Sequence, residues 1–336
     1  MRIAINGFGR IGRSFFRLAF EDPKIEIVAI NDLADIENLA YLLKYDTVYG
    51  KYEKEVICVF EEAGEKLKVA AKKIPFFQEK DPKNLPWKEL RVDVVVEATG
   101  VFADYLKAWV HIKAGAKKVI ITAPAGEGEE EKGRTVLLGI NDEDLKKFEV
   151  ISNGSCTTNA VAPVIQILEE KIGIKKAILN TVHAYTSTQR SVDSPSSDDW
   201  RRGRAASQNI IPSTTGAAKC VTKVIKSLKD KFDGIALRVP VVCGSIADIT
   251  FISKTPISAE EINKIFKEST KEKRWKGIVE VVDQSIVSSD IIGTLAPAIV
   301  DLSFTKVIDE DLVKVLVWYD NEWAYSSTLL QQIKKL

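Results

Sequence analysis

The sequence contains few of the residues that mark extracellular, metal-binding or membrane proteins. Its 336 residues include four cysteines and two histidines. The cysteines, Cys58, Cys156, Cys220 and Cys243, are far apart and show neither metal-ligand spacing nor a disulfide framework. No apolar run is long enough to span a bilayer, and no signal peptide precedes the first expected strand. We therefore expect a cytoplasmic protein with no metal site and no membrane contact.

An excess of charge of either sign is also missing. Lys and Arg number 48 and Asp and Glu 47, which leaves a formal net charge of +1. Nucleic-acid-binding proteins carry a clear basic surplus, so we expect no nucleic acid as a partner. With 45% hydrophobic residues, the chain has the composition and length of a globular protein of about two domains.

One polar stretch, at 152–160, surrounds Cys156. It follows a short apolar run at 148–151 and precedes an amphipathic helix pattern at 162–168. Cys156 is therefore expected at a strand-to-helix turn, where the helix dipole and the N–H groups of the first turn favour a thiolate and can hold an anion. A buried structural cysteine is the alternative, but the polar neighbours favour a nucleophile.

The N-terminal residues form a dinucleotide-binding pattern. A strand at 2–6 leads into G-x-G-x-x-G at Gly7, Gly9 and Gly12, followed by a helix at 11–20. A second strand at 25–30 precedes Asp32, at the distance expected of a carboxylate that binds an adenosine ribose. The glycines would let the backbone approach a pyrophosphate at the helix N-terminus.

Two more expected strands complete this domain. The strand at 92–96 ends before Thr99, the strand at 118–121 ends before Thr122, and a helix is expected between them at 103–114. Hydroxylic residues at such strand ends face the ligand in a doubly wound sheet. His111 falls within the helix, and we interpret it as a packing residue.

The residues after Cys156 have a different pattern. Alternating strands are expected at 176–183, 235–239 and 245–253, with helices at 257–269 and 322–335. The fold class is therefore α/β, a Rossmann-type doubly wound sheet followed by an α+β domain with a mostly antiparallel sheet. We place the NAD-binding domain at 1–155 and the catalytic domain at 156–321, and expect the helix at 322–336 to pack back on the first.

Three features of the second part suit catalysis on a phosphorylated substrate. His183 ends a strand and would serve as the base for Cys156. Arg238 ends another strand and supplies a forked cation for phosphate. Thr215 and Gly216 open a helix, which is a further possible anion site.

Seven motifs resemble the phosphorylating glyceraldehyde-3-phosphate dehydrogenases from end to end. They are NGFGRIGR at 6–13, KYD at 44–46, SCTTN at 155–159, HAYT at 183–186, STTGAAK at 213–219, RVP at 238–240 and WYDNEW at 318–323. The resemblance implies a homotetramer that oxidises glyceraldehyde 3-phosphate with NAD and inorganic phosphate to 1,3-bisphosphoglycerate. It also implies a thiohemiacetal and then a thioester on Cys156, with His183 as base.

The resemblance assigns further residues to ligands. For the two phosphate sites it implies Thr186 and Arg238 on the substrate side and Ser155, Thr157 and Thr215 on the side of the attacking phosphate. For the cofactor it implies Arg10, Ile11, Thr99, Phe102 and Asn321, in addition to Gly7, Gly9, Asp32 and Thr122 from the strand ends. Asp32 indicates NAD rather than NADP, and the resemblance implies the same from Pro195, in an aperiodic segment at 193–208, because a proline there belongs to NAD-specific members of the family.

Three other functions compete with this one. An erythrose-4-phosphate dehydrogenase would share the cofactor domain and the cysteine, but Thr186 and the 214–216 motif favour the triose. A reductase of acyl phosphates such as aspartyl phosphate would not need HAYT or WYDNEW. A binding protein without turnover would not need Cys156 or His183, and both are present.

Overall fold

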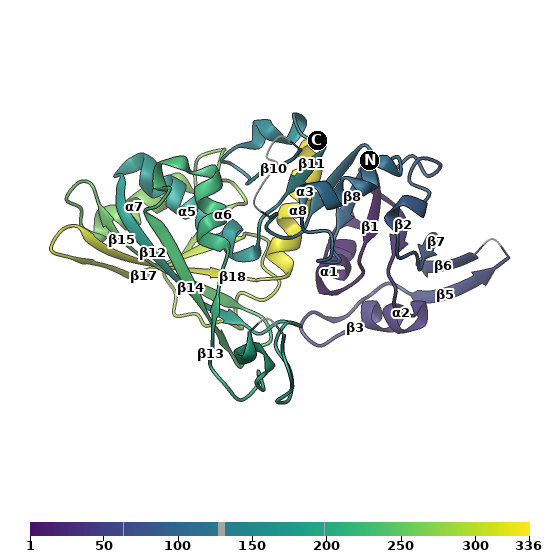
Figure 1. The fold of residues 1–336 in the computed structure, drawn as a ribbon. Coiled ribbons are helices and arrows are strands. Elements are labelled where there is room, and N and C mark those ends of the chain that lie inside the picture. Colours follow the sequence, from purple (N-terminus) through teal and green to yellow (C-terminus); the bar gives the residue numbers. More distant parts are fainter. Residues whose placement is uncertain (63, 127–131, 198) are drawn as a thin grey trace. The chain divides into compact units, whose positions relative to one another are not determined.

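The structure is a computed structural model that describes residues 1–62, 64–126, 132–197 and 199–336 (Figure 1). The chain divides into two compact units. The first comprises Met1–Val136, Asp142–Gly154 and Ser326–Leu336, and the second comprises Leu137–Asn141 and Ser155–Tyr325. Among the described residues, none of the helices combines the length and the apolar character that crossing a bilayer requires.

A nine-stranded sheet forms the centre of the first unit, in the order β10-β11-β9-β8-β1-β2-β7-β6-β5. Every pair from β10 to β7 is parallel, and β7-β6-β5 is an antiparallel edge. The strands are β1 (Arg2–Asn6), β2 (Glu26–Asn31), β5 (Val56–Glu61), β6 (Gly64–Val69), β7 (Lys72–Phe77), β8 (Val94–Glu97), β9 (Lys118–Ile121), β10 (Arg134–Thr135) and β11 (Val150–Ser152). The strand order reverses between β1 and β8, which is where a doubly wound sheet binds its ligand. The predicted Rossmann-type sheet is confirmed.

The helices of the first unit include those expected at 11–20 and at the C-terminus, each within one residue of its expected bounds. They are α1 (Arg10–Ala19), α2 (Ile36–Lys44), α3 (Tyr105–Ala108), α4 (Val110–Lys113) and the C-terminal α8 (Trp323–Lys335), with short 3-10 turns η1 (Pro82–Asn84) and η2 (Asp142–Lys146) and the small β3 (Tyr45–Asp46) and β4 (Gly50–Lys51) pair. The single helix expected at 103–114 is observed as two one-turn helices that meet at Trp109, whose backbone stays helical and donates to Tyr105 O. Late in α8, Gln332 Nε2 donates to Val136 O at 2.7 Å.

A seven-stranded sheet forms the second unit, in the order β13-β14-β12-β15-β18-β17-β16. Its strands are β12 (Ile174–Ala184), β13 (Ile211–Thr214), β14 (Phe232–Val239), β15 (Ser245–Ser253), β16 (Val279–Val282), β17 (Ala298–Ile308) and β18 (Leu312–Tyr319). The pairs β12–β14 and β16–β17 are parallel and the other four are antiparallel. This mixed, mostly antiparallel sheet confirms the predicted α+β class.

Helices cover one face of this sheet (Figure 1). They are α5 (Cys156–Lys171), α6 (Ala217–Val224) and α7 (Ala259–Ser269), with 3-10 turns η3 (Trp200–Gly203) and η4 (Lys226–Leu228) in the connections. Apolar residues of α5 such as Ile165 and Leu168 are fully buried in the same core cluster as Val315 of β18. In the sheet, β12 and β14 run in parallel with His183 opposite Arg238, so two polar residues lie next to each other near the carboxyl ends of these strands.

Candidate active site

Cys156 lies at the start of α5. Ser155 is the N-cap, and its Oγ accepts a hydrogen bond from Thr158 N at 3.1 Å. The cap satisfies one N–H group of the first turn and fixes the direction in which the helix begins. The thiol therefore lies where the positive end of the helix dipole acts on it.

The imidazole of His183 contacts the thiol. His183 is the penultimate residue of β12, and its Nε2 lies 3.4 Å from Cys156 Sγ. Both residues belong to the second unit, although 27 positions separate them in the sequence. A nucleophile and a base within hydrogen-bond reach are the two components that covalent catalysis requires.

The other ring nitrogen of His183 has two competing neighbours. Ala184 O, which can only accept, lies 2.7 Å from Nδ1, and Arg238 Nη1, which can only donate, lies 2.5 Å from it. When Nδ1 donates to Ala184 O, Nε2 presents a lone pair to Cys156 and can take a proton. When Arg238 donates to Nδ1, Nε2 carries the hydrogen and can only donate to sulfur. The position of Arg238 thus selects between two tautomers of the base.

Burial keeps both partners of the pair neutral. Burial raises the pKa of the Cys156 thiol, and the charge of Arg238 and hydrogen bonds from Thr157 oppose that rise. Burial, with the charge of Arg238 next to the ring, lowers the pKa of His183 to about 3. A thiol and an uncharged imidazole are therefore the resting forms, and the proton moves from sulfur to nitrogen only when the sulfur attacks.

A tyrosine that was not predicted as a site residue packs next to the pair and connects the two elements that carry it. Tyr319 is 1% exposed, and its hydroxyl lies 2.9 Å from Thr157 Oγ1 and 2.7 Å from Thr181 Oγ1. Its ring meets that of His183 edge to face, with centroids 5.9 Å apart. The hydroxyl therefore connects the first turn of α5 to β12. The hydroxyl of Thr157, which the resemblance assigns to phosphate, is engaged in this link.

Arginine side chains leave donors unused near the candidate base. Within the described residues, Arg238 Nε and Arg202 Nε are buried donors without a hydrogen-bond partner. Burial lowers the pKa of Arg238, and the charge of Arg202 adds to that effect. Arg202 was not predicted as a site residue, although it belongs to the arginine-rich 193–208 segment, of which all but residue 198 is described. Buried, unpaired guanidinium donors are an arrangement that an anion completes.

The remaining phosphate candidates lie on two turns of the second unit. Thr186 closes a turn after β12, where its N–H donates to Gln189 Oε1 at 2.9 Å and its hydroxyl lies 2.9 Å from Thr188 Oγ1. Thr215 precedes α6 and accepts from Ala217 N at 3.2 Å. Gly216 is the exposed N-cap of that helix. These contacts fix the turns, while no hydrogen bond between described residues joins either turn to Cys156.

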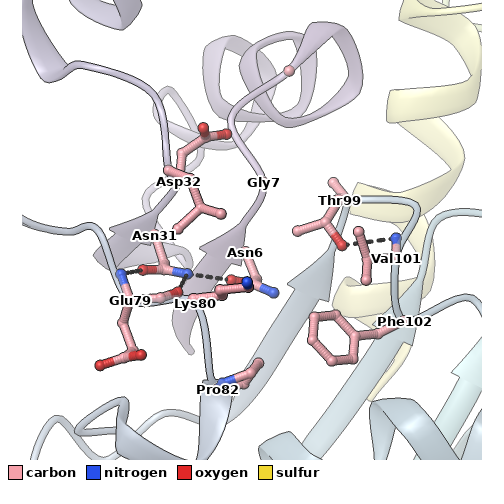
Figure 2. Close-up of a pocket in the computed structure, with 13 residues that line it drawn as sticks. Asn6, Gly7, Asn31, Asp32, Glu79, Lys80, Pro82, Thr99, Val101 and Phe102 are labelled. Carbon is pink, nitrogen blue, oxygen red and sulfur yellow. Dashed lines mark hydrogen bonds between the residues drawn. The ribbon is translucent and has the colours of Figure 1, made fainter.

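The first unit holds a pocket of about 460 Å³ at the strand-order reversal (Figure 2). Five expected cofactor residues line it, namely Gly7, Gly9, Asp32, Thr99 and Phe102. The other lining residues are Asn6, Asn31, Leu33, Glu79, Lys80, Pro82, Ala98 and Val101. A lining that combines amide and charged side chains with apolar ones suits a nucleotide.

The glycines of the G-x-G-x-x-G motif differ in what surrounds them. A Cβ on Gly12 would lie 2.1 Å from Gly7 O, so glycine is needed there for the turn itself. A Cβ on Gly9 would meet no described atom within 4 Å. Gly9 nevertheless lines the pocket, at the N-terminus of α1. The protein leaves this space open where a pyrophosphate would approach the backbone, so the pocket fits a dinucleotide.

The other expected cofactor residues have contacts of their own. Arg10 forms an ion pair with Asp46 and lies over the ring of Tyr49, and Ile11 is the second residue of α1. Thr122 donates its N–H to Glu97 O at 2.9 Å.

Asn321 belongs to the second unit. Its Oδ1 accepts from Gly244 N and from Ser245 Oγ, at 3.1 and 3.0 Å. These two donors fix the orientation of the amide, so its nitrogen points away from them.

Comparisons with known proteins identify the family. The family model "Glyceraldehyde 3-phosphate dehydrogenase, NAD binding domain" matches residues 1–105, and the corresponding C-terminal domain model matches residues 155–321. The chain belongs to the glyceraldehyde-3-phosphate dehydrogenase family. The resemblance predicted from the motifs is confirmed, and so is NAD as the cofactor, because residues 1–105 contain the whole pocket of Figure 2.

Relatives in this family match the chain over its whole length. A glyceraldehyde-3-phosphate dehydrogenase of Thermotoga maritima is 51% identical over 100% of this chain and 98% of its own length. Glyceraldehyde-3-phosphate dehydrogenase 2 of Bacillus subtilis is 46% identical over 99% of this chain and 96% of its own. A third relative, from Borreliella burgdorferi, is 46% identical over 100% and 99%.

The contrast between Gly9 and Gly12 predicts different outcomes for two alanine substitutions. Gly9→Ala adds a methyl group only to the space assigned to the pyrophosphate, so we expect an unchanged melting temperature and a Kd for NAD that rises by about tenfold or more. Gly12→Ala places its Cβ against Gly7 O and should destabilise the unit itself. Calorimetric titration with NAD and thermal melting measure the two effects. Unchanged NAD binding by Gly9→Ala would contradict the proposed path of the pyrophosphate.

The lowered pKa of His183 makes stability depend on pH. The folded protein takes up this proton near pH 3, whereas the unfolded chain takes it up near the ordinary value of 6.5. Between these values the unfolded chain binds more protons, so stability rises with pH and is lost as pH falls from 6.5 toward 3. The melting temperature of the unmodified protein should therefore fall more steeply between pH 6.5 and 4 than that of His183→Asn. Parallel curves would mean that His183 is not buried as a neutral imidazole.

Proposed function

We propose that this chain oxidises glyceraldehyde 3-phosphate, with NAD and inorganic phosphate, to 1,3-bisphosphoglycerate. The observation that carries the proposal is the contact of Cys156 Sγ with His183 Nε2, next to a guanidinium with an unpaired buried donor. A nucleophile, a base and a cation in contact can together attack an aldehyde that carries an anionic group. Cys156 and His183 are the catalytic residues of the proposal, and Arg238 is its principal anion-binding residue.

The first step is attack of the Cys156 sulfur on the aldehyde carbon. The sulfur forms a bond to carbon, its proton passes to His183 Nε2, and the carbonyl oxygen becomes the alkoxide of a thiohemiacetal. His183 can then return its proton to that oxygen, since the lowered pKa of His183 makes its protonated form a strong acid. N–H groups at the start of α5 lie on the same turn as Cys156 and would stabilise the oxygen while it is charged.

Anion binding prepares the base in this proposal. A phosphate that accepts hydrogen bonds from Arg238 withdraws Nη1 from His183 Nδ1. Nδ1 can then donate to Ala184 O, at 2.7 Å, and Nε2 faces sulfur with its lone pair. Thr186 would add a hydroxyl donor on the substrate side, and Ser155, Thr157, Thr215 and Gly216 would bind the attacking phosphate.

NAD, when bound, would supply the acceptor for the hydride that leaves the thiohemiacetal carbon. As that carbon becomes a thioester, the thiohemiacetal hydroxyl gives its proton back to His183 Nε2, so His183 is protonated again. Asp32 would hold the adenosine ribose, Gly7 and Gly9 the pyrophosphate, and Asn321 the nicotinamide carboxamide. Arg10, Ile11, Thr99, Phe102 and Thr122 complete the proposed set. Phosphate then attacks the thioester carbon and displaces Cys156 sulfur, which regains its proton from His183.

The full-length relatives do not favour the erythrose 4-phosphate alternative. Two of them, from Bacillus subtilis and Thermotoga maritima, are both named glyceraldehyde-3-phosphate dehydrogenase. This agrees with the presence of Thr186 and Thr215, which suit the shorter substrate in the family pattern.

A homotetramer in the cytoplasm is part of the proposal. Ile178 and Ile235 are 58% and 51% exposed on neighbouring strands β12 and β14, on the sheet face away from the helices. Apolar residues exposed side by side in this way support burial against another copy of the chain. All four cysteines are among the described residues and none forms a disulfide, which suits a reducing compartment.

Substitution of the nucleophile tests the proposed function. Cys156→Ser should reduce phosphate-dependent NADH formation from glyceraldehyde 3-phosphate to less than a few per cent, because a hydroxyl is a far weaker acid than a thiol. NAD binding should stay within about twofold, since Cys156 lies outside the pocket of Figure 2. Erythrose 4-phosphate in the same assay is the substrate control. Faster turnover of erythrose 4-phosphate by the unmodified enzyme would reject the triose assignment.

Cofactor choice depends on Asp32. Its carboxylate accepts from Phe8 N at 2.6 Å and from Ala34 N at 2.9 Å, so it is held at the pocket (Figure 2). A 2′-phosphate about 4 Å from this charge would be repelled by about 4 kcal/mol at an effective dielectric of 20. Even half of that gives a preference of roughly thirtyfold, so we expect kcat/KM for NAD to exceed that for NADP by at least about tenfold.

Two variants make this expectation specific. Asp32→Gly should reduce the ratio of kcat/KM for NAD to that for NADP, mainly by weakening the binding of NAD. Asp35→Asn removes an equal charge three residues away and retains an acceptor for the cap of α2. The Asp35 variant should keep the selectivity of the unmodified enzyme. Equal use of NAD and NADP by the unmodified enzyme would show that Asp32 does not bind the ribose.

A further inference from the structure

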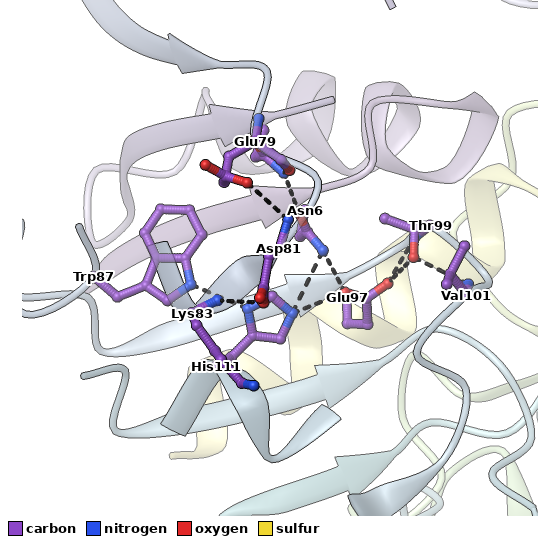
Figure 3. A network of polar contacts seen from close by, with 10 residues as sticks. Asn6, Glu79, Asp81, Lys83, Trp87, Glu97, Thr99, Val101 and His111 are labelled. Carbon is purple, nitrogen blue, oxygen red and sulfur yellow. Dashed lines mark hydrogen bonds and ion pairs between the residues drawn. The ribbon is translucent and has the colours of Figure 1, made fainter. Parts of the chain in front are cut away.

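A buried polar network lies behind the cofactor pocket (Figure 3). At its centre is Glu97, the last residue of β8, which is 1% exposed. One carboxylate oxygen, Oε2, lies 2.6 Å from Asn6 Nδ2 and 2.9 Å from His111 Nε2. The other, Oε1, lies 2.9 Å from Thr99 N and also accepts from the Thr99 hydroxyl. Each oxygen of the carboxylate is therefore contacted by two polar groups.

The direction of these hydrogen bonds follows from Trp87. Its Nε1–H can only donate, and it lies 3.0 Å from His111 Nδ1, which must therefore present a lone pair. The single ring hydrogen of a neutral His111 is then on Nε2 and points to Glu97. The N–H groups of Asn6, His111 and Thr99 can only donate to the carboxyl, and the Thr99 hydroxyl donates to Oε1, so four donors without a full charge surround it. Glu97 is a carboxylate held by four neutral donors.

Two hydrogen-bond partners of Glu97 connect it to the cofactor pocket. Asn6 and Thr99 both line the pocket. Asn6 Oδ1 in turn accepts from Asn31 Nδ2 at 2.7 Å, and Thr99 Oγ1 accepts from Val101 N at 3.0 Å. Asn31 and Val101 are lining residues as well. One buried carboxylate therefore fixes side chains and backbone at the carboxyl ends of β1, β2 and β8, between which the pocket opens.

We propose that Glu97 is a positioning residue for the adenosine half of NAD, with His111 holding the carboxylate in place. The inference rests on the proposed function. The adenosine half is implicated because Asp32 and Gly9 line the same pocket. The site needs a carboxylate because each of the two oxygens accepts from two donors. A carboxamide has one oxygen, so its NH₂ group would face either Asn6 and His111 or the Thr99 N–H.

Binding measurements on Glu97→Gln test the proposal. The Kd for NAD should rise by about tenfold, the loss expected when buried donors lose their acceptor. ADP-ribose, which lacks the nicotinamide, should lose affinity by a similar factor in the same calorimetric titration. At saturating NAD, kcat should stay within about twofold, so the effect appears in KM for NAD alone.

Asp301→Asn is the matched control. Asp301 is also 1% exposed and is also a carboxylate with two occupied oxygens, one accepting from Trp318 Nε1 at 3.0 Å and the other from Ser303 N at 3.1 Å. It belongs to β17 in the second unit. Both variants should lower the melting temperature, but only Glu97→Gln should weaken NAD and ADP-ribose. Equal weakening by both, or normal ADP-ribose binding by Glu97→Gln, would overturn the proposal.

A second pair of variants decides the question if Glu97→Gln does not fold. His111→Gln keeps a donor in place of Nε2 and should bind ADP-ribose nearly as the unmodified protein does, whereas His111→Leu should bind it several-fold more weakly. Equal affinities of the two would contradict the proposal. Failure of the proposed function has a different signature, namely an unmodified enzyme that forms no NADH from glyceraldehyde 3-phosphate, which leaves the ADP-ribose titrations unaffected.

Discussion

The contact between Cys156 Sγ and His183 Nε2 is the interaction on which the rest of the structure's chemistry depends. It requires the first residue of a helix to meet the end of a strand. The Ser155 cap fixes where α5 begins, and burial of α5 against the seven-stranded sheet fixes where it lies. The Tyr319 hydroxyl, bonded to Thr157 and Thr181, then ties the two elements together beside the pair. The core of the second unit thus determines a distance of a few ångströms between two reactive groups.

Burial of this pair has electrostatic consequences that fit a two-substrate reaction. It raises the pKa of the thiol and lowers that of the imidazole, so neither is charged at rest. Of the side chains of Cys156, His183 and Arg238, only that of Arg238 carries charge, and it contacts the imidazole directly. In the proposed function, an anion would both satisfy the buried guanidinium of Arg238 and release His183 as the base. This coupling would restrict nucleophile activation to moments when a phosphate-bearing substrate is bound.

Local patterns predicted the parts of the fold that local interactions specify. The turn before Cys156 and the glycine motif at 7–12 were predicted because a strand, a turn and a helix follow each other within a few residues. The contacts of Tyr319 and Glu97 could not be predicted in this way. Thr181 lies 138 positions from Tyr319, and only the register of β12, β15 and β18 brings them together. His111 was expected merely to pack, because the sequence does not show that Trp87 determines its tautomer or that Glu97 accepts its hydrogen bond.

The most direct test of the central claim is the amount of NADH formed in the first turnover by enzyme mixed with NAD and glyceraldehyde 3-phosphate in the absence of phosphate. If Cys156 carries the acyl group, a rapid burst should approach one NADH per active site and then nearly stop, and added phosphate should restore steady turnover. Stopped-flow absorbance at 340 nm, with active sites counted by alkylation of Cys156, provides the stoichiometry. Steady NADH formation at the same rate with and without phosphate would contradict a thioester on Cys156 that phosphate must release.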